Sequence, residues 1–154
     1  MTAAFTGTQR GMTPAQSARI EILLRFLGVT RVLHGACEGS DREFHDLTKG
    51  ILRELYPGTP EQAEWASAHV APGDRVWPVP NDAKPQISRD HHMVDRAPIL
   101  IAAPLGRHEV LRSGTWATVR YAMGRLKAKP PHAVTVYLVF PNGDVQEHRY
   151  ALAV

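Results

Sequence analysis

Short apolar runs alternate with amphipathic segments along most of the chain. The run at 99–103 is continuous and lies between two prolines, which is typical of a parallel strand that is covered on both faces. The pattern predicts strands over residues 3–6, 30–34, 75–79, 99–103, 133–140 and 145–152. It predicts helices over residues 15–27, 61–68, 86–96 and 113–126, and another from Ser40 or Asp41 toward Leu55.

Capping and turn residues mark several of these boundaries. Thr13-Pro14 supplies an N-cap and a first-turn proline, and Gly28 closes the helix that follows. Ser113 is placed to cap the last helix, and Asn142-Gly143 predicts a hairpin turn into an edge strand.

The order of the elements predicts an α/β fold. Strands that alternate with helices favour a Rossmann-like three-layer sandwich with a mostly parallel sheet, a C-terminal edge hairpin and binding loops at the carboxyl ends of the strands. Six of the twelve prolines lie within 56–88, so this is the part where we expect the most irregular structure. A length of 154 residues fits one domain.

Composition narrows the class of protein. The net charge of +3 and the pI near 9.3 suit an anionic ligand but are too weak to specify nucleic acid. The single cysteine, Cys37, fits a reducing compartment. Because the N-terminus lacks the apolar core of a signal peptide and no stretch reaches transmembrane length, we expect a cytoplasmic protein without a membrane partner.

Two glycine-containing loops carry the candidate chemistry. In residues 34–45 a strand ends at His34, Gly35 and Gly39 frame a turn, and an acidic residue opens a helix. Residues 112–122 repeat the arrangement near the other end of the chain. Loops of this kind let a phosphate or ribose approach the amides of a helix N-terminus, so together they predict one nucleotide-sized pocket.

Three segments resemble DNA-processing protein A, in the same order. HGACEGSDREFH at 34–45 is similar to its S-G-x-A-x-G-x-D-x-x-A-H segment, and RDHHMVDRA at 89–97 to its R-N-R-x-I segment, with Arg89 kept and His91 in place of the second arginine. SGTWATVRYA at 113–122 resembles its S-G-[ST]-x-x-T-x-x-x-A segment. The chain is therefore identified as a member of the SLOG superfamily, which also holds the "lonely guy" phosphoribohydrolases. GTQRGM at 7–12 looks like the first-strand loop of that superfamily, with Arg10 one residue later than its usual arginine.

The chain departs from both relatives. The phosphoribohydrolases have a glutamate in P-G-G-x-G-T-x-x-E that serves cleavage of the base–ribose bond, whereas Thr115 here is followed by no nearby carboxylate. Nothing in the chain looks like the winged-helix domain of DNA-processing protein A.

Most candidate residues have a structural alternative. Gly35 and Gly39 suit a tight turn as well as ligand approach. Asp41 is a helix cap, a hydrogen-bond partner for a ribose hydroxyl, or a residue that supports the loop. Ser113 can cap a helix whose N-terminus also receives a phosphate. Arg89 either forms a surface ion pair or binds phosphate with both guanidinium nitrogens.

Other residues carry weaker signals. Cys37 is more simply a small residue that fills the loop, and Trp116 is more simply a core residue than a ring that stacks on a base. The histidines lack metal-ligand spacing, so we expect no metal and no cofactor.

These observations lead to one main hypothesis and two alternatives. The main one is a protein that binds a nucleotide or a nucleotide-derived signal as a sensor, carrier or sequestering protein. The alternatives are a nucleoside 5′-monophosphate phosphoribohydrolase, with Arg89 and Asp41 as catalytic residues, and a single-stranded DNA-binding module. The resemblance also implies a homodimer. The expected ligand-binding residues are Gly7, Thr8, Arg10, Gly11, His34, Gly35, Gly39, Asp41, Arg89, Ser113, Gly114, Thr115 and Thr118.

Overall fold

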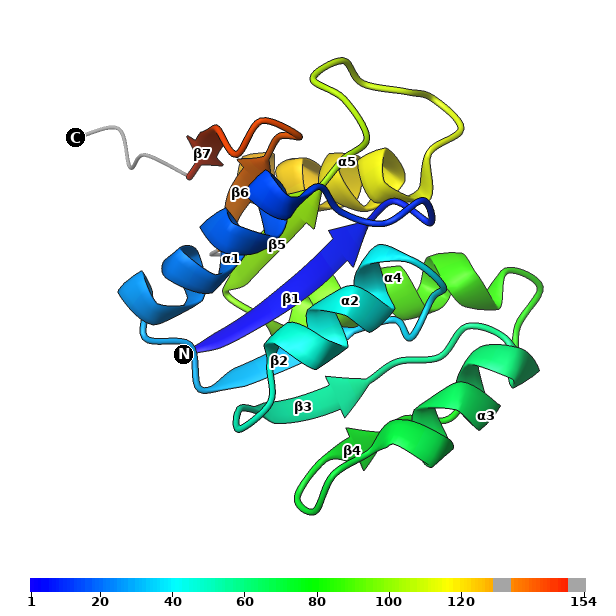
Figure 1. Ribbon diagram of the computed structural model, residues 1–154. Coiled ribbons are helices and arrows are strands. Elements are labelled where there is room, and N and C mark those ends of the chain that lie inside the picture. The colour runs from blue at the N-terminus through cyan, green and yellow to red at the C-terminus, as the bar shows by residue number, and fades with distance from the viewer. Residues whose placement is uncertain (129–133, 150–154) are drawn as a thin grey trace.

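A seven-stranded sheet forms the middle layer of the protein (Figure 1). The computed structural model describes residues 1–128 and 134–149. The strands are β1 (Thr2–Gly7), β2 (Arg31–His34), β3 (Leu52–Leu55), β4 (Arg75–Val76), β5 (Ile99–Ala103), β6 (Thr135–Val139) and β7 (Val145–His148). The helices are α1 (Pro14–Phe26), α2 (Ser40–Leu47), α3 (Pro60–His69), α4 (Pro85–Arg96) and α5 (Gly114–Lys127).

The strand order places a topological switch point beside β1. The order across the sheet is β4-β3-β2-β1-β5-β6-β7, and every pair is parallel except β6 with β7. The chain runs outward from β1 to β4, then crosses back to place β5 on the other side of β1. In open sheets of this kind ligands bind outside the carboxyl ends of the strands at the switch point. The topology therefore predicts a ligand site at the carboxyl end of β1.

Helices cover both faces of the sheet (Figure 1). On one face α1 and α2 bury apolar side chains against β1, β2, β5 and β6, with Phe5 and Phe44 stacked at a centroid distance of 4.1 Å. On the other face α4 and α5 form a second core that includes Met93, Trp116 and Val119. Alternate residues of β1 and β5 enter opposite cores, as the two-residue period of a strand requires.

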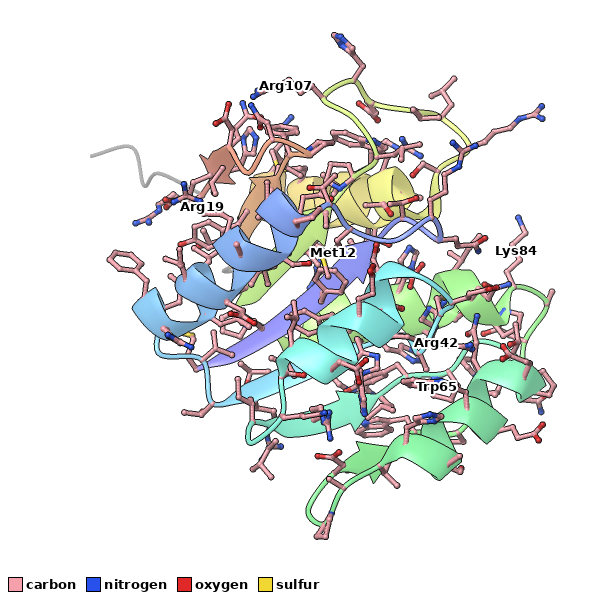
Figure 2. All side chains as sticks on the ribbon, in the orientation of Figure 1. Met12, Arg19, Arg42, Trp65, Lys84 and Arg107 are labelled. Carbon is pink, nitrogen blue, oxygen red and sulfur yellow. The ribbon has the colours of Figure 1, made fainter. Side chains whose placement is uncertain are left out.

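Helix α3 packs on β3 and β4 at the edge of the sheet through an apolar cluster, and it contacts α2 through polar and aromatic side chains. Arg42 of α2 pairs with Glu61 at 2.8 Å, and its guanidinium lies 4.9 Å from the centroid of the Trp65 ring. Figure 2 shows Arg42 and Trp65 next to each other between α2 and α3. These contacts stabilise the side of the molecule on which the proline-rich segment lies.

The predicted fold class is confirmed, together with most of the helices. Helix α1 begins with a capping box at Thr13 and is followed by Gly28 at φ 64°, and α3, α4 and α5 begin within one residue of their predicted starts. Trp116 is a core residue, 7% exposed.

Four element boundaries are corrected. The helix that starts at Ser40 ends at Leu47, and the last predicted residues of that helix form β3 instead. Strand β4 covers only Arg75–Val76 of the predicted 75–79, because prolines follow at 78 and 80. Strand β6 ends at Val139, one residue before the predicted end, and β7 ends at His148. The predicted strand residues 133 and 150–152 lie outside the described residues.

Among the described helices, none combines the length and the apolar character that crossing a membrane requires.

Candidate functional site

A cavity of about 540 Å³ opens at the carboxyl end of β1. Four segments form its walls: the β1–α1 loop, the β2–α2 loop, the first turns of α4 and the N-terminus of α5. In Figure 1 these segments meet below the long loop that joins β5 to α5. The lining residues are Phe5, Thr6, Gly7, Thr8, Gln9, Arg10, Cys37, Asp41, Gln86, Ile87, Arg89, Asp90, Met93, Arg112, Ser113, Gly114, Thr115 and Ala117.

The β1–α1 loop and the β2–α2 loop, which both line the cavity, pack closely against each other. A Cβ on Gly39 would lie 2.1 Å from the carbonyl oxygen of Gln9, and a Cβ on Gly7 would lie 2.5 Å from the Cβ of Ser40. The Ser40 hydroxyl donates to the Thr8 carbonyl at 2.6 Å. Gly7 and Gly39 are therefore required by packing within the protein, whatever the cavity binds.

Asp41 is a buried carboxylate in the cavity wall. It lies in the first turn of α2, but Gly39 is the N-cap and makes no side-chain cap, so the prediction that Asp41 caps the helix is wrong. Its Oδ2 instead accepts hydrogen bonds from the amides of Gly35 and Cys37, each at 3.1 Å. Burial raises the pKa of Asp41 to about 6, against the opposing effects of Arg89 and these amides.

Arg89 organises the floor of the cavity rather than its opening. The side chain is 4% exposed. Its Nη1 donates to the carbonyls of Gly35 at 2.6 Å and Tyr56 at 2.8 Å, and Nη2 donates to the sulfur of Cys37 at 2.9 Å. Its Nε donates to Asp90 at 2.6 Å. A guanidinium has five N–H donors, and these bonds occupy most of them. The ion pair of Arg89 with Asp90 is buried and not on the surface, and a bidentate phosphate contact would have to displace some of these partners.

Asp90 is a second carboxylate in the cavity. Its Oδ1 accepts from Arg89 Nε at 2.6 Å, and beside it lies the hydroxyl of Thr118 on α5, which donates to the Gly114 carbonyl at 3.0 Å. Burial raises the pKa of Asp90, although these two neighbours act in the opposite direction. The contact with Thr118 ties α4 to α5 at the cavity floor.

The N-terminus of α5 supplies the features that suit an anion. The Ser113 hydroxyl accepts from the Trp116 amide at 3.3 Å, which confirms Ser113 as the N-cap. The amides of Gly114 and Thr115 belong to the first turn, where helix geometry supplies no partner. A Cβ on Gly114 would meet no atom within 4 Å. Packing therefore gives no reason for glycine at this position.

Two exposed arginines, Arg10 and Arg112, line the cavity, and within residues 1–128 and 134–149 neither makes an ion pair. Together with the positive end of the α5 dipole they favour an anion in the cavity. Asp41 and Asp90 also line the cavity, beside the buried guanidinium of Arg89.

Several predicted ligand residues lie outside the cavity lining. Gly11, Gly35, Gly39 and Thr118 support its walls, since each contacts a lining residue or a loop that carries one. A Cβ on Gly35 would lie 2.4 Å from Nη1 of Arg89. A glycine is therefore needed at position 35 to make room for the arginine side chain.

His34 belongs to a buried relay behind the β2–α2 loop. Its Nδ1 accepts from the Ala36 amide at 3.0 Å, so its Nε2 carries the proton and donates to Nδ1 of His45 at 2.9 Å. The Nε2 of His45 then donates to the carbonyl of His69 at 3.0 Å. This arrangement satisfies two neutral imidazoles, and burial lowers the pKa of both.

Part of the cavity lining was not predicted from the sequence. Gln86, Asp90 and Arg112 were not predicted, and Cys37 was given only a filling role although its thiol lines the cavity and accepts from Arg89 and Gln62. Burial raises the pKa of Cys37 to about 12, so its thiol is protonated at neutral pH. Of these residues, only Arg112 could have been predicted to line the cavity, because it directly precedes the Ser113 cap in the sequence.

Among the described residues, no group of three histidine, cysteine or carboxylate side chains is placed to hold a metal ion. Comparison with known proteins finds no protein-family model, curated protein or solved structure that matches the chain.

Proposed function

We propose that this protein binds a nucleotide or a nucleotide-derived signal in the cavity at the end of β1, as a sensor, carrier or sequestering protein. The phosphate would lie on the first turn of α5 between Arg10 and Arg112. The sugar would extend toward Asp41.

The observation that carries the proposal is the first turn of α5. Its glycine faces open space, and its amides lie at the positive end of a helix of 14 residues. Arg10 and Arg112, which make no ion pair with any described residue, line the same cavity. Helix N-termini with these features bind phosphate. The cavity volume of about 540 Å³ lies within the range of small-molecule sites, and the resemblance of three segments to the SLOG superfamily supports the same ligand class.

The test is the mass of what the protein retains. Any ligand that the purified protein retains is released under mild conditions and identified by mass spectrometry. The ligand-free protein is then titrated with AMP, GMP, CMP and UMP by calorimetry. A retained nucleotide, or micromolar binding of at least one of the four, supports the proposal. A protein that retains none and binds none contradicts it.

A phosphoribohydrolase is the second candidate, and the two carboxylates favour it. Asp41, with its pKa near 6, is suited to exchange a proton near neutral pH, and Asp90 lies in the same cavity. Chromatography of the protein incubated with the four monophosphates separates the candidates. Free base produced over many turnovers, and lost in Asp41→Asn, would establish the hydrolase, whereas unchanged nucleotide supports binding alone.

A further inference from the structure

Asp41 presents one oxygen that the protein does not use. The side chain is 6% exposed and lines the cavity. Both loop amides, those of Gly35 and Cys37, donate to Oδ2. Within the part of the chain that the structure describes, Oδ1 accepts no hydrogen bond, so it is the oxygen left to the cavity. This oxygen is not among the buried unpartnered atoms of the described residues, so it is accessible from the cavity, where a ligand can donate to it.

The other charged groups of the floor do not fill this position. Arg89 directs its Nη1 and Nη2 to the carbonyls of Gly35 and Tyr56 and to the sulfur of Cys37. Asp90 Oδ1 accepts from Arg89 Nε in an ion pair, and the Thr118 hydroxyl beside it donates to the Gly114 carbonyl. Asp41 is therefore the carboxylate of the described lining that makes no ion pair and keeps one oxygen without a donor.

The chemistry of that acceptor limits what can lie against it. A carboxylate repels a phosphate, which Arg10 and Arg112 attract, and it binds hydroxyl or amino donors. In a nucleotide the donors nearest to the phosphate are the ribose hydroxyls. A 2′-deoxyribonucleotide lacks one of them.

We propose that Asp41 binds the ribose hydroxyls through Oδ1 and makes the cavity selective for ribonucleotides over 2′-deoxyribonucleotides. This inference rests on the proposed nucleotide-binding function. It also favours a free ribonucleotide over single-stranded DNA as the natural ligand.

The primary test needs no variant. AMP, GMP, CMP and UMP are titrated by calorimetry at pH 7.5 beside their 2′-deoxy counterparts. A charge-assisted hydrogen bond contributes enough for each ribonucleotide that binds to do so about 10- to 100-fold more tightly than its deoxy form. Equal affinity within the pairs overturns the inference and leaves the proposed function standing. A preference that follows the base and ignores the 2′-hydroxyl also overturns it, since Asp41 would then bind a base amino group.

Asp41→Asn provides the matched test of the residue. The amide oxygen of asparagine can accept from the amides of Gly35 and Cys37, while its NH₂ group replaces the free acceptor by a donor. Ribonucleotide affinity should fall to the level of the deoxy forms, and deoxy affinity should not change. Asp46→Asn, on the exposed side of the same helix, removes the same charge and should leave both affinities as in the wild type.

A measurement on the wild-type protein covers the case in which Asp41→Asn does not fold. At pH 5 Asp41 is largely protonated, because its pKa is about 6, so the ratio of ribonucleotide to deoxynucleotide affinity should shrink. The ionisation of the phosphate is common to both members of a pair and cancels in the ratio. A ratio that is the same at pH 5 and pH 7.5 overturns the role of Asp41. If no nucleotide binds at all, the proposed function fails and the inference fails with it.

Discussion

Gly114 differs from the other glycines around the cavity in what surrounds it. A Cβ on Gly7, Gly35 or Gly39 would overlap Ser40, Arg89 or Gln9, whereas a Cβ on Gly114 would reach nothing within 4 Å. The need for glycine at positions 7, 35 and 39 is therefore explained by packing within the folded protein. Gly114 is the position at which the absence of a side chain leaves room for a ligand.

We expect Gly114→Val to weaken nucleotide binding without loss of the fold. The branched side chain would occupy the space over the first amides of α5, so affinity measured by calorimetry should fall at least about tenfold, or roughly 1.4 kcal/mol. Gly124→Ala on the same helix is the control. Its position is exposed and its Cβ also meets nothing, so it should raise stability by about 0.5–1 kcal/mol and leave affinity unchanged. If a folded Gly114→Val protein bound nucleotide with wild-type affinity, the proposal that the phosphate lies on the first turn of α5 would be wrong.

Arg89→Lys should affect stability before it affects binding. A lysine cannot donate at once to Gly35, Tyr56, Cys37 and Asp90, so buried carbonyls and a carboxylate would lose their partner. Urea unfolding should show a loss of about 3 kcal/mol or more. Arg10→Lys, at an exposed position, should change the unfolding free energy by less than about 0.5 kcal/mol. Equal stability of wild type and Arg89→Lys would return Arg89 to the role of a ligand residue.

Local sequence signals predicted some residue roles and not others. The Ser113 cap could be recognised because a serine before a helix acts on the amide three residues later. For Asp41 the sequence left a helix cap and support of the loop both open. The folded loop decides between them, because the amides of Gly35 and Cys37 donate to Asp41 and Gly39 takes the capping position. The use of Arg89 depends on carbonyls 33 and 54 residues away in the sequence, which no local pattern encodes.

At the level of elements, the largest error was to extend α2 toward Leu55. The LREL segment of β3 contains good helix formers, so propensity favoured a continued helix. Two features end α2 early: the Thr48 hydroxyl donates back to the carbonyls of Phe44 and His45, and Gly50 adopts a φ of 87°. Strand β3 then forms because it pairs with β2 over four residues, a long-range contact that outweighs local preference.

An ion pair fixes β3 to the turn before β4. Arg53 and Asp74 pair at 3.1 Å with side chains only 6% and 3% exposed, and Asp74 also accepts from the amides of Arg53 and Ala71. Asp74→Ala leaves a buried guanidinium without its charge partner and should cost about 3–5 kcal/mol by urea unfolding. Glu109→Ala, which removes a pair with half-exposed members, should cost less than about 1 kcal/mol. Similar losses in the two variants would show that the β3–β4 edge does not depend on this pair.

For the whole molecule, alternation of strands and helices predicted the layers and the end of the sheet at which the cavity lies. The buried continuous run of β5 and the hairpin at Asn142-Gly143 gave strong signals. The composition of the cavity was harder to predict, because it depends on four segments that meet only in the folded protein. Asp90 and Gln86 come from α4, where the motif at 89–97 pointed to Arg89 and gave no role to Asp90, and Gln86 lies before that motif.

The pH dependence of stability links the cavity to the buried histidines behind it. His34 and His45 have lowered pKa values in the folded protein, so below about pH 6.5 the unfolded chain binds more protons. Stability should therefore fall as the pH is lowered from 8 to 5.5, by up to about 1.4 kcal/mol per pH unit for each histidine that stays neutral. Asp41 acts in the opposite direction: its raised pKa of about 6 makes the folded state bind the extra proton between about pH 6 and 4.

Urea unfolding of three variants across this range separates the contributions. In His34→Gln the amide can still donate to His45 but does not titrate, so the loss of stability with falling pH should be shallower than in the wild type. In Asp41→Asn the opposing contribution is gone, so the loss below pH 6 should be steeper. His108→Gln, on the exposed β5–α5 loop, should follow the wild type. A wild-type protein whose unfolding free energy is constant between pH 8 and 5.5, or a His34→Gln protein with an unchanged slope, would show that the buried relay does not control acid stability.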